Sequence, residues 1–135
     1  MIEEDYVNFE TANLLKEKGF DELCYACYEY FESGVTLYKG WTFEYKGYPV
    51  HNSLYRIKCP TLQMAMKWLR EKHHYYIQVM LDSWACGDHT GYYVVIQKTD
   101  SDFELMLQDV REQVFYENPE EAYEDAIKYC LENLI

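Results

Sequence analysis

The hydrophobic pattern changes from a helical period to a strand period within residues 59–81, CPTLQMAMKWLREKHHYYIQVML. At about 100° per residue, one broad arc gathers the apolar side chains of Leu62, Met64, Ala65, Met66, Trp68 and Leu69. Alternating apolar positions then follow at Tyr75, Ile77, Val79 and Leu81. Pro60 ends the preceding element, and Thr61 suits an N-cap. The pattern therefore predicts a helix that leads directly into a strand.

Two further helices are predicted both by the spacing of their apolar residues and by the capping residues at their ends. Over residues 8–20, Asn8 suits the N-cap, Gly19 suits a left-handed C′ position, and Phe20 would pack back on Leu15. Over residues 119–134, Asn118-Pro119 begins a helix with glutamates in its first turn. Its predicted inward face consists of Ala122, Ala126, Ile127, Cys130, Leu131 and Leu134.

Short strand patterns fill most of the remaining chain. Between residues 22 and 58 they cover 24–31, 35–38, 41–45 and 54–58, with turn signals at Lys39-Gly40 and Lys46-Gly47. The pairing of these strands stays open. Residues 92–98 predict a strand antiparallel to 75–81, and residues 82–91 (DSWACGDHTG) predict a polar loop between them. Residues 103–116 fit both periods; we favour a strand over 103–108.

The predicted fold class is α+β. An antiparallel sheet of about four to six strands would be packed by an N-terminal, a central and a C-terminal helix. A chain of 135 residues is most economically a single domain, residues 1–135. If helices cover one sheet face, the tyrosine-rich opposite face must be solvated, covered by a loop or paired with another subunit.

The net charge of the chain limits the kinds of macromolecule that it is expected to bind. The net charge is −12, and residues 100–135 hold 11 acidic and 2 basic side chains. Such a chain repels nucleic acid backbones, so direct binding to DNA or RNA is not expected. A basic protein partner fits better, including one that normally binds nucleic acid. Fifteen tyrosines add side chains that suit half-buried sheets and contact surfaces.

Cysteine usage and hydropathy indicate the compartment. Five cysteines without regular spacing do not form a disulfide framework, which favours reduced thiols in a cytoplasm. The N-terminal residues MIEEDY lack the apolar region of a secretory signal, and no run approaches the roughly 18 apolar residues of a membrane span. We expect a cytoplasmic protein without membrane association.

Two motifs suggest chemistry but have simpler structural explanations. Cys24 and Cys27 form C-x-x-C inside a strand pattern, where side chains three positions apart point to opposite faces and no second pair completes a zinc site. His73 and His74 close the central helix, where a cation favours the helix dipole. We expect no metal and no cofactor at either motif.

The loop at residues 82–91 is the best candidate for chemistry. It gathers a thiol, a carboxylate and an imidazole at Cys86, Asp88 and His89, which are weak candidates for metal ligands or for a small thiol enzyme. A metal site needs further ligands, and His51, His73 or His74 could join only if the fold brings them close. No P-loop, G-x-G-x-x-G, H-E-x-x-H or G-x-S-x-G motif is present, so an enzyme is not expected.

Three sequence blocks carry a family resemblance. The order LLKEKGF-DE-C, then PT-x5-KWLREKH, then NPEEAYEDAI, within residues 9–28, 59–74 and 118–135, resembles a family of small bacterial proteins with no established activity. Such proteins are commonly encoded in phage and other mobile elements. This chain has Leu23 where members often carry proline, and Cys59 where they often carry alanine. The resemblance implies an accessory protein inside a bacterial cell and supplies no catalytic residues.

The sequence thus favours a non-enzymatic protein that binds a protein partner through an acidic, tyrosine-rich surface, in one version by mimicking nucleic acid. Glu121, Glu124, Asp125 and Trp84 are the predicted partner-binding residues. The alternatives are a small metal-dependent or thiol enzyme at residues 82–91, and a self-associating structural module, for which a homodimer is the simplest form.

Overall fold

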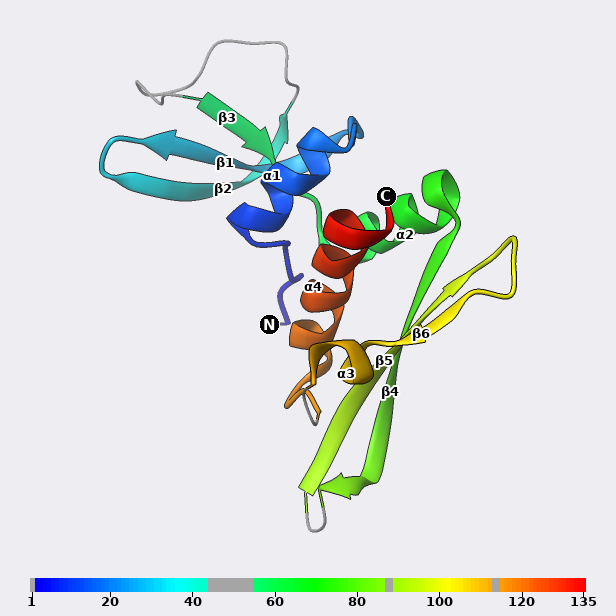
Figure 1. Ribbon diagram of the computed structural model, residues 1–135. Coiled ribbons are helices and arrows are strands. Elements are labelled where there is room, and N and C mark those ends of the chain that lie inside the picture. The colour runs from blue at the N-terminus through cyan, green and yellow to red at the C-terminus, as the bar shows by residue number, and fades with distance from the viewer. Residues whose placement is uncertain (1, 44–54, 87–88, 113–114) are drawn as a thin grey trace. The chain divides into compact units, whose positions relative to one another are not determined.

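The computed structural model describes residues 2–43, 55–86, 89–112 and 115–135, and gives the backbone alone at residues 40–43, 55, 83–86, 89 and 90 (Figure 1). The chain divides into two compact units, Met1–Gln63 and Met64–Ile135, which we describe separately. The single domain of the sequence analysis stays a prediction.

The α+β class is confirmed. Among the described residues the helices are α1 (Phe9–Glu17), α2 (Leu62–His73), α3 (Leu107–Arg111) and α4 (Pro119–Tyr129). The strands are β1 (Cys24–Phe31), β2 (Gly34–Phe43), β3 (Tyr55–Lys58), β4 (Tyr75–Cys86), β5 (His89–Lys98) and β6 (Glu104–Met106). Their number agrees with the prediction, but they form two antiparallel sheets, ordered β2-β1-β3 and β4-β5-β6, instead of one.

Helix α1 has the predicted caps at both ends. The Asn8 side chain accepts a hydrogen bond from the Thr11 N–H at 2.8 Å. At the other end Gly19 has φ +92°, its N–H donates to the Lys16 carbonyl, and the Phe20 N–H donates to the Leu15 carbonyl at 2.9 Å. These two bonds define a Schellman motif. Phe20 and Leu15 are both buried, and the packing of their side chains on each other stays a prediction.

Strand β2 corrects the prediction for residues 35–45. The two predicted strands are one strand, Gly34–Phe43, and Lys39-Gly40 lies inside it instead of forming a turn. The register with β1 shifts: Ala26 pairs with Lys39, but Cys24 pairs with Phe43. Two extra residues of β2 are therefore absorbed in a bulge, which a glycine accommodates easily. The predicted turn at Lys46-Gly47 lies outside the described residues.

The helix-to-strand stretch has the predicted boundaries. Ala65, Trp68 and Leu69 of α2 are buried, whereas Arg70 and Glu71 are exposed. His74 follows the helix with φ +65°, and β4 begins at the next residue. A single left-handed residue thus turns the chain from helix to strand, which is why two strong patterns can adjoin without a loop.

The prediction of a polar loop at residues 82–91 is wrong. Strands β4 and β5 continue to Cys86 and His89, which pair with each other, and a register shift separates this pair from Asp82–Gly91. Pairing of the backbone in the arms of a hairpin does not require apolar side chains, so a polar composition did not identify a loop here. The antiparallel pairing of 75–81 with 92–98 is confirmed.

The last third of the chain follows the prediction in part. Residues 104–106 form β6, but the chain becomes helical at Leu107, so the strand predicted to 108 ends early. Asn118 caps α4 by accepting from the Glu121 N–H at 2.9 Å, with Pro119 in the first turn. A π-helical turn, η1 (Cys130–Leu134), completes this element.

Candidate protein-interaction surface

The second sheet has one face that packs against α4. Tyr75, Ile77, Val94 and Ile96 point to this covered face and are at most 7% exposed. The Tyr75 hydroxyl donates a hydrogen bond to the Leu134 carbonyl at 3.2 Å, which ties the strand to the end of the last helix. Burial of this face by α4 and η1 supplies the core of the second unit.

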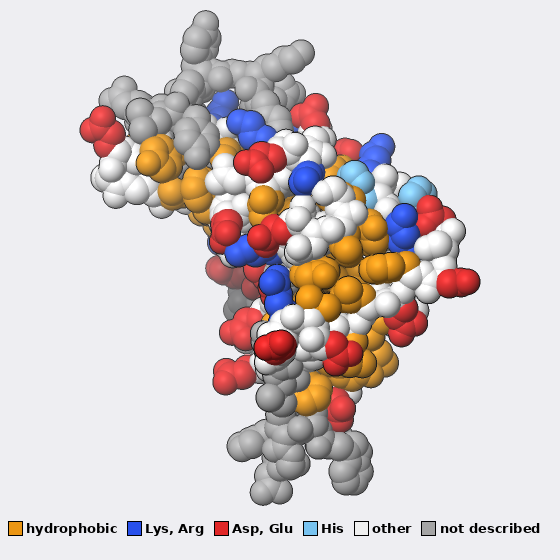
Figure 2. Space-filling model, in the orientation of Figure 1, with side chains coloured by type: hydrophobic (Ala, Val, Ile, Leu, Met, Phe, Trp, Pro, Cys, Tyr) orange, Lys and Arg blue, Asp and Glu red, His pale blue; other side chains and the backbone are white. Residues whose placement is uncertain are grey.

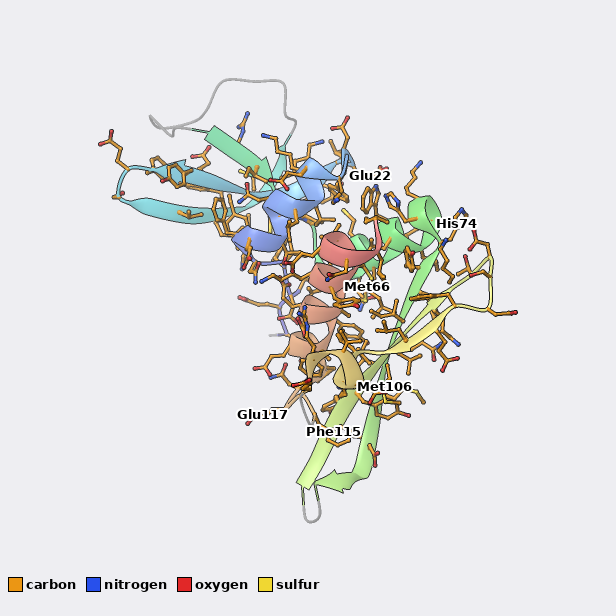
Figure 3. All side chains as sticks on the ribbon, in the orientation of Figure 1. Glu22, Met66, His74, Met106, Phe115 and Glu117 are labelled. Carbon is orange, nitrogen blue, oxygen red and sulfur yellow. The ribbon has the colours of Figure 1, made fainter. Side chains whose placement is uncertain are left out.

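The opposite face of the same sheet is exposed. We call it the open face, and the strand register assigns to it Tyr76, Gln78, Met80, Tyr93, Val95, Gln97, Glu104 and Met106. Tyr76, Met80 and Met106 are each 43% exposed. Met106 lies where β6 passes into α3 (Figure 3). These side chains lie on β4 and β6, the two strands that flank β5. Large apolar side chains that are half-exposed on one sheet face are typical of surfaces that bind other molecules.

A row of hydrogen-bonded polar side chains crosses the open face. The Gln78 amide donates to the Gln97 amide oxygen, and the Gln97 amide donates to the Glu104 carboxylate at 3.3 Å. We call these three residues the amide row. A charged carboxylate only accepts hydrogen bonds, so Glu104 sets the direction of both donors. The row runs across all three strands and fixes the side chains between the exposed tyrosines and methionines.

Charge on the open face is of one sign. Glu104 is the charged residue among these eight, Asp82 continues the same face of β4 in register with Gly91, and Asp102 precedes β6 at the Glu104 end of the sheet. Lys98 belongs to the other face, where its ammonium lies 5.4 Å from the centre of the Tyr75 ring. A hollow of about 350 Å³ lies at this end, lined by Tyr76, Gln97, Lys98, Thr99, Ser101, Asp102, Phe103 and Glu104.

The free edge of β5 beyond β6 is closed by groups from later in the chain. The Gln108 side chain accepts from the Val94 N–H at 3.1 Å and donates to the Tyr92 carbonyl at 3.3 Å. Tyr116 exchanges two backbone hydrogen bonds with Tyr92, both of 3.0 Å. Gln108, buried in α3, thus takes the place of a strand residue. Only the long-range fold reveals this role, because an isolated glutamine carries no local signal for it.

The fold does not bring His73 and His74 close to the candidate site at residues 82–91. His73 and His74 precede β4, whereas Cys86 ends it, and twelve extended residues span about 35 Å. Figure 3 shows His74 at the junction of α2 and β4. The side chains of Trp84, Cys86 and His89, and all of His51 and Asp88, lie outside the described residues. Within the described part of the chain, no three His, Cys, Asp or Glu side chains are grouped to hold a metal ion.

The C-x-x-C cysteines are both buried in the first unit. Burial raises the pKa of the Cys24 thiol from 9.0 to about 11 and that of Cys27 to about 12. The nearby Lys58 ammonium opposes the shift at Cys24, and the Glu29 carboxylate adds to the shift at Cys27. A neutral thiol is a poor nucleophile and a poor ligand. These two cysteines therefore act as small apolar core residues.

The predicted partner-binding carboxylates of α4 differ in their availability. Glu121 is exposed, and Glu124 and Asp125 are both half-buried, but Asp125 is engaged by two neighbouring side chains. The Arg111 guanidinium donates to Asp125 at 2.9 and 3.3 Å, and the Tyr116 hydroxyl also donates to it. Burial, and then the hydrogen bond to Asp125, raise the pKa of Tyr116. Asp125 thus joins α4 to α3 and to the segment that closes β5.

The acidic side chains do not form one continuous patch in the view of Figure 2, where they are dispersed among hydrophobic and uncharged ones. The side chains of the open face are a more compact candidate for binding than the carboxylates of α4.

Comparison of the chain with protein-family models, with curated proteins and with solved structures finds no match. The described helices include none with the length and apolar character needed to cross a membrane.

Proposed function

We propose that this chain is a non-enzymatic protein-binding module, and that the open face of its second sheet binds a basic protein partner. The observation that carries the proposal is the exposure of Tyr76, Met80 and Met106 on one sheet face, opposite the face that α4 buries. Tyrosine and methionine are among the residues enriched in protein interfaces, where they supply contact area and adaptable packing.

Charge supports a basic partner. The chain has a net charge of −12, and the charged residues that the register puts on this face, Glu104 and Asp82, are acidic. Complementary charge accelerates association and favours the correct partner, so binding should weaken as salt rises. The same charge disfavours direct contact with nucleic acid.

Mimicry of nucleic acid is the sharper form of this proposal. The partner would then be a protein with a DNA- or RNA-binding groove, and the acidic residues 100–135 would compete for that groove. In the setting implied by the family resemblance, this partner is a protein of the bacterial cytoplasm. Glu121 is the carboxylate to reverse in a competition test, because it is exposed, whereas Asp125 is engaged by Arg111.

The experiment compares two matched lysine substitutions. Met106→Lys puts a cation on the open face, whereas Val35→Lys puts one on β2 of the first sheet, where the apolar side chain is 39% exposed. Both variants and the wild type are immobilised and used to capture proteins from a bacterial extract over a range of salt concentrations. We expect one saturable basic partner, captured about tenfold less well by Met106→Lys and equally well by Val35→Lys.

Two results would contradict the proposal. One is the absence of any saturable partner above background, and the other is equal loss of capture in both variants. Folding of each variant is checked by circular dichroism and by its unfolding midpoint in urea.

A further inference from the structure

Strand β4 is the outermost strand of its sheet, and its first seven residues lack the usual protection of an edge. The order β4-β5-β6 leaves one side of β4 without a partner strand among the described residues of the second unit. Residues 75–81, YYIQVML, contain no charged residue, no glycine and no proline. Natural edge strands commonly use charge, proline, short length or bulges to prevent pairing with another chain.

The hydrogen bonds of the sheet show which backbone groups of β4 point outward. The Thr99 N–H donates to the His74 carbonyl at 2.8 Å, and the Lys98 N–H donates away from β4, to Phe103, at 3.1 Å. Bonds alternate along an antiparallel pair, so the even residues of β4 bond to β5. Tyr75, Ile77, Val79 and Leu81 consequently direct their N–H and C=O groups to the open edge.

The amide row also ends at this edge. Glu104 accepts from Gln97, so the oxygen of Gln97 faces Gln78 and accepts from it. This leaves the carbonyl oxygen of Gln78 and one of its N–H groups available beyond the outer strand. An added strand with an amide at the facing position would complete both.

We propose that β4 pairs antiparallel with β4 of a second copy of this chain, with Gln78 opposite Gln78 on the two-fold axis. The two amides then bond reciprocally, and the amide rows of both copies join. Ile77 comes opposite Val79, and both have outward backbone groups, so the ladder bonds form in this register. On the open face Tyr76 comes opposite Met80, a favourable ring–sulfur pair.

The charge distribution favours this self-pairing at this one segment. A chain with a net charge of −12 resists association with itself, but residues 75–81 carry no charge and can meet without repulsion. Just beyond this segment, the same register places the imidazole of His74 opposite the carboxylate of Asp82. The result is an isologous dimer whose open face continues across six strands.

This proposal does not depend on the basic partner proposed above. Met106 is on β6, the strand farthest from the β4 edge, so the two tests address separate residues. An extended peptide of another protein would use the same backbone groups, but it would not give a two-fold symmetric contact at Gln78.

The first test measures mass in solution. Light scattering after size exclusion, over a range of concentrations, should give twice 16.3 kDa for the wild type. Gln78→Lys places two like charges together on the axis and should raise the dimer dissociation constant roughly tenfold or more. Val95→Lys adds a lysine to the same face one strand inward, outside the amide row, and should leave the dimer intact. A monomeric wild type, or equal effects of both variants, would overturn the proposal.

The second test measures register. A cysteine in place of Gln78 faces its copy in a non-hydrogen-bonded pair, close enough for a disulfide after small adjustment. Mild oxidation of Gln78→Cys should therefore give a covalent dimer much faster than oxidation of Val95→Cys, one strand inward, or of the wild type. Equal rates in all three proteins would overturn the register. Circular dichroism confirms that each variant is folded.

Discussion

The first and second sheets are each antiparallel and three-stranded, and each has one face packed by a helix, but their remaining surfaces differ. In the first unit, Phe9 of α1 packs edge-on against Tyr28 of β1, with ring centres 5.6 Å apart. Opposite that face, Glu29 of β1 pairs in register with Arg56 of β3, and the Lys58 ammonium lies 3.1 Å from the Asp21 carboxylate. The second face of the first sheet is thus rich in charge of both signs.

An edge strand of the first sheet and an edge strand of the second also differ in length and in charge. Strand β3, an edge of the first sheet, has four residues and includes Arg56 and Lys58. Strand β4, an edge of the second sheet, has twelve residues and begins with seven uncharged ones. Short length and lysine are two ways in which proteins prevent edge pairing. The second face of the first sheet thus carries charges of both signs, whereas the second sheet has an edge segment without charge, which supports the association proposed for the second unit.

The largest expected effect concerns the covered faces, where the two sheets should behave alike. Ile57 and Ile96 are buried on the helix-packed faces of the first and second sheets. Ile57→Ala and Ile96→Ala should each lower the free energy of unfolding by about 2–4 kcal/mol, measured by urea denaturation. Val95→Ala, on the open face beside Ile96, should cost about 1 kcal/mol or less. An equal cost at Val95 would show that the open face is packed after all.

A smaller loss in the free energy of unfolding is expected from removing Asp125, a carboxylate that is hydrogen-bonded within the second unit. Asp125→Ala removes the acceptor for Arg111 and Tyr116 and should cost about 1–3 kcal/mol. Glu132→Ala, at an exposed position of η1, should change the free energy of unfolding by about 0.5 kcal/mol or less. If the two variants unfold at the same urea concentration, Asp125 is not the tie between α3 and α4 that its hydrogen bonds indicate.

The smallest expected effects come from the two helix caps, one in each unit. Asn8→Ala and Asn118→Ala each remove one hydrogen bond at a helix N-terminus and should cost about 1 kcal/mol. If residues 1–135 form a single domain, both substitutions shift one cooperative thermal transition. Two transitions, each shifted by one substitution alone, would show instead that the units unfold independently.

Features determined by neighbouring residues could be predicted from the sequence. The caps at Asn8 and Asn118, the glycine at position 19 and the change of period after Lys72 depend on groups within about one helical turn. The structure has each of them where the pattern placed it.

Features that depend on strand partners could not be predicted. The division into two sheets, the bulge that makes β2 a single strand and the closure of β5 by Gln108 arise from pairings between distant residues. In the sequence, Gln78 stands out as a polar residue between apolar neighbours. The direction of the hydrogen bonds in the amide row follows only from the contact between Gln97 and Glu104. The predicted loop at residues 82–91 was wrong because composition alone does not report backbone pairing.

The central claim is that the second unit uses the β4 edge and its open face for association. Hydrogen exchange at single amides of β4, followed by NMR at low and high protein concentration, tests it most directly. At low concentration the amides of Tyr76, Gln78 and Met80 should exchange slowly and those of Ile77 and Val79 rapidly, because only the first set bonds to β5. At high concentration Ile77 and Val79 should become protected, and Gln78→Lys should abolish this change. Rapid exchange of Ile77 and Val79 at every concentration would contradict the account.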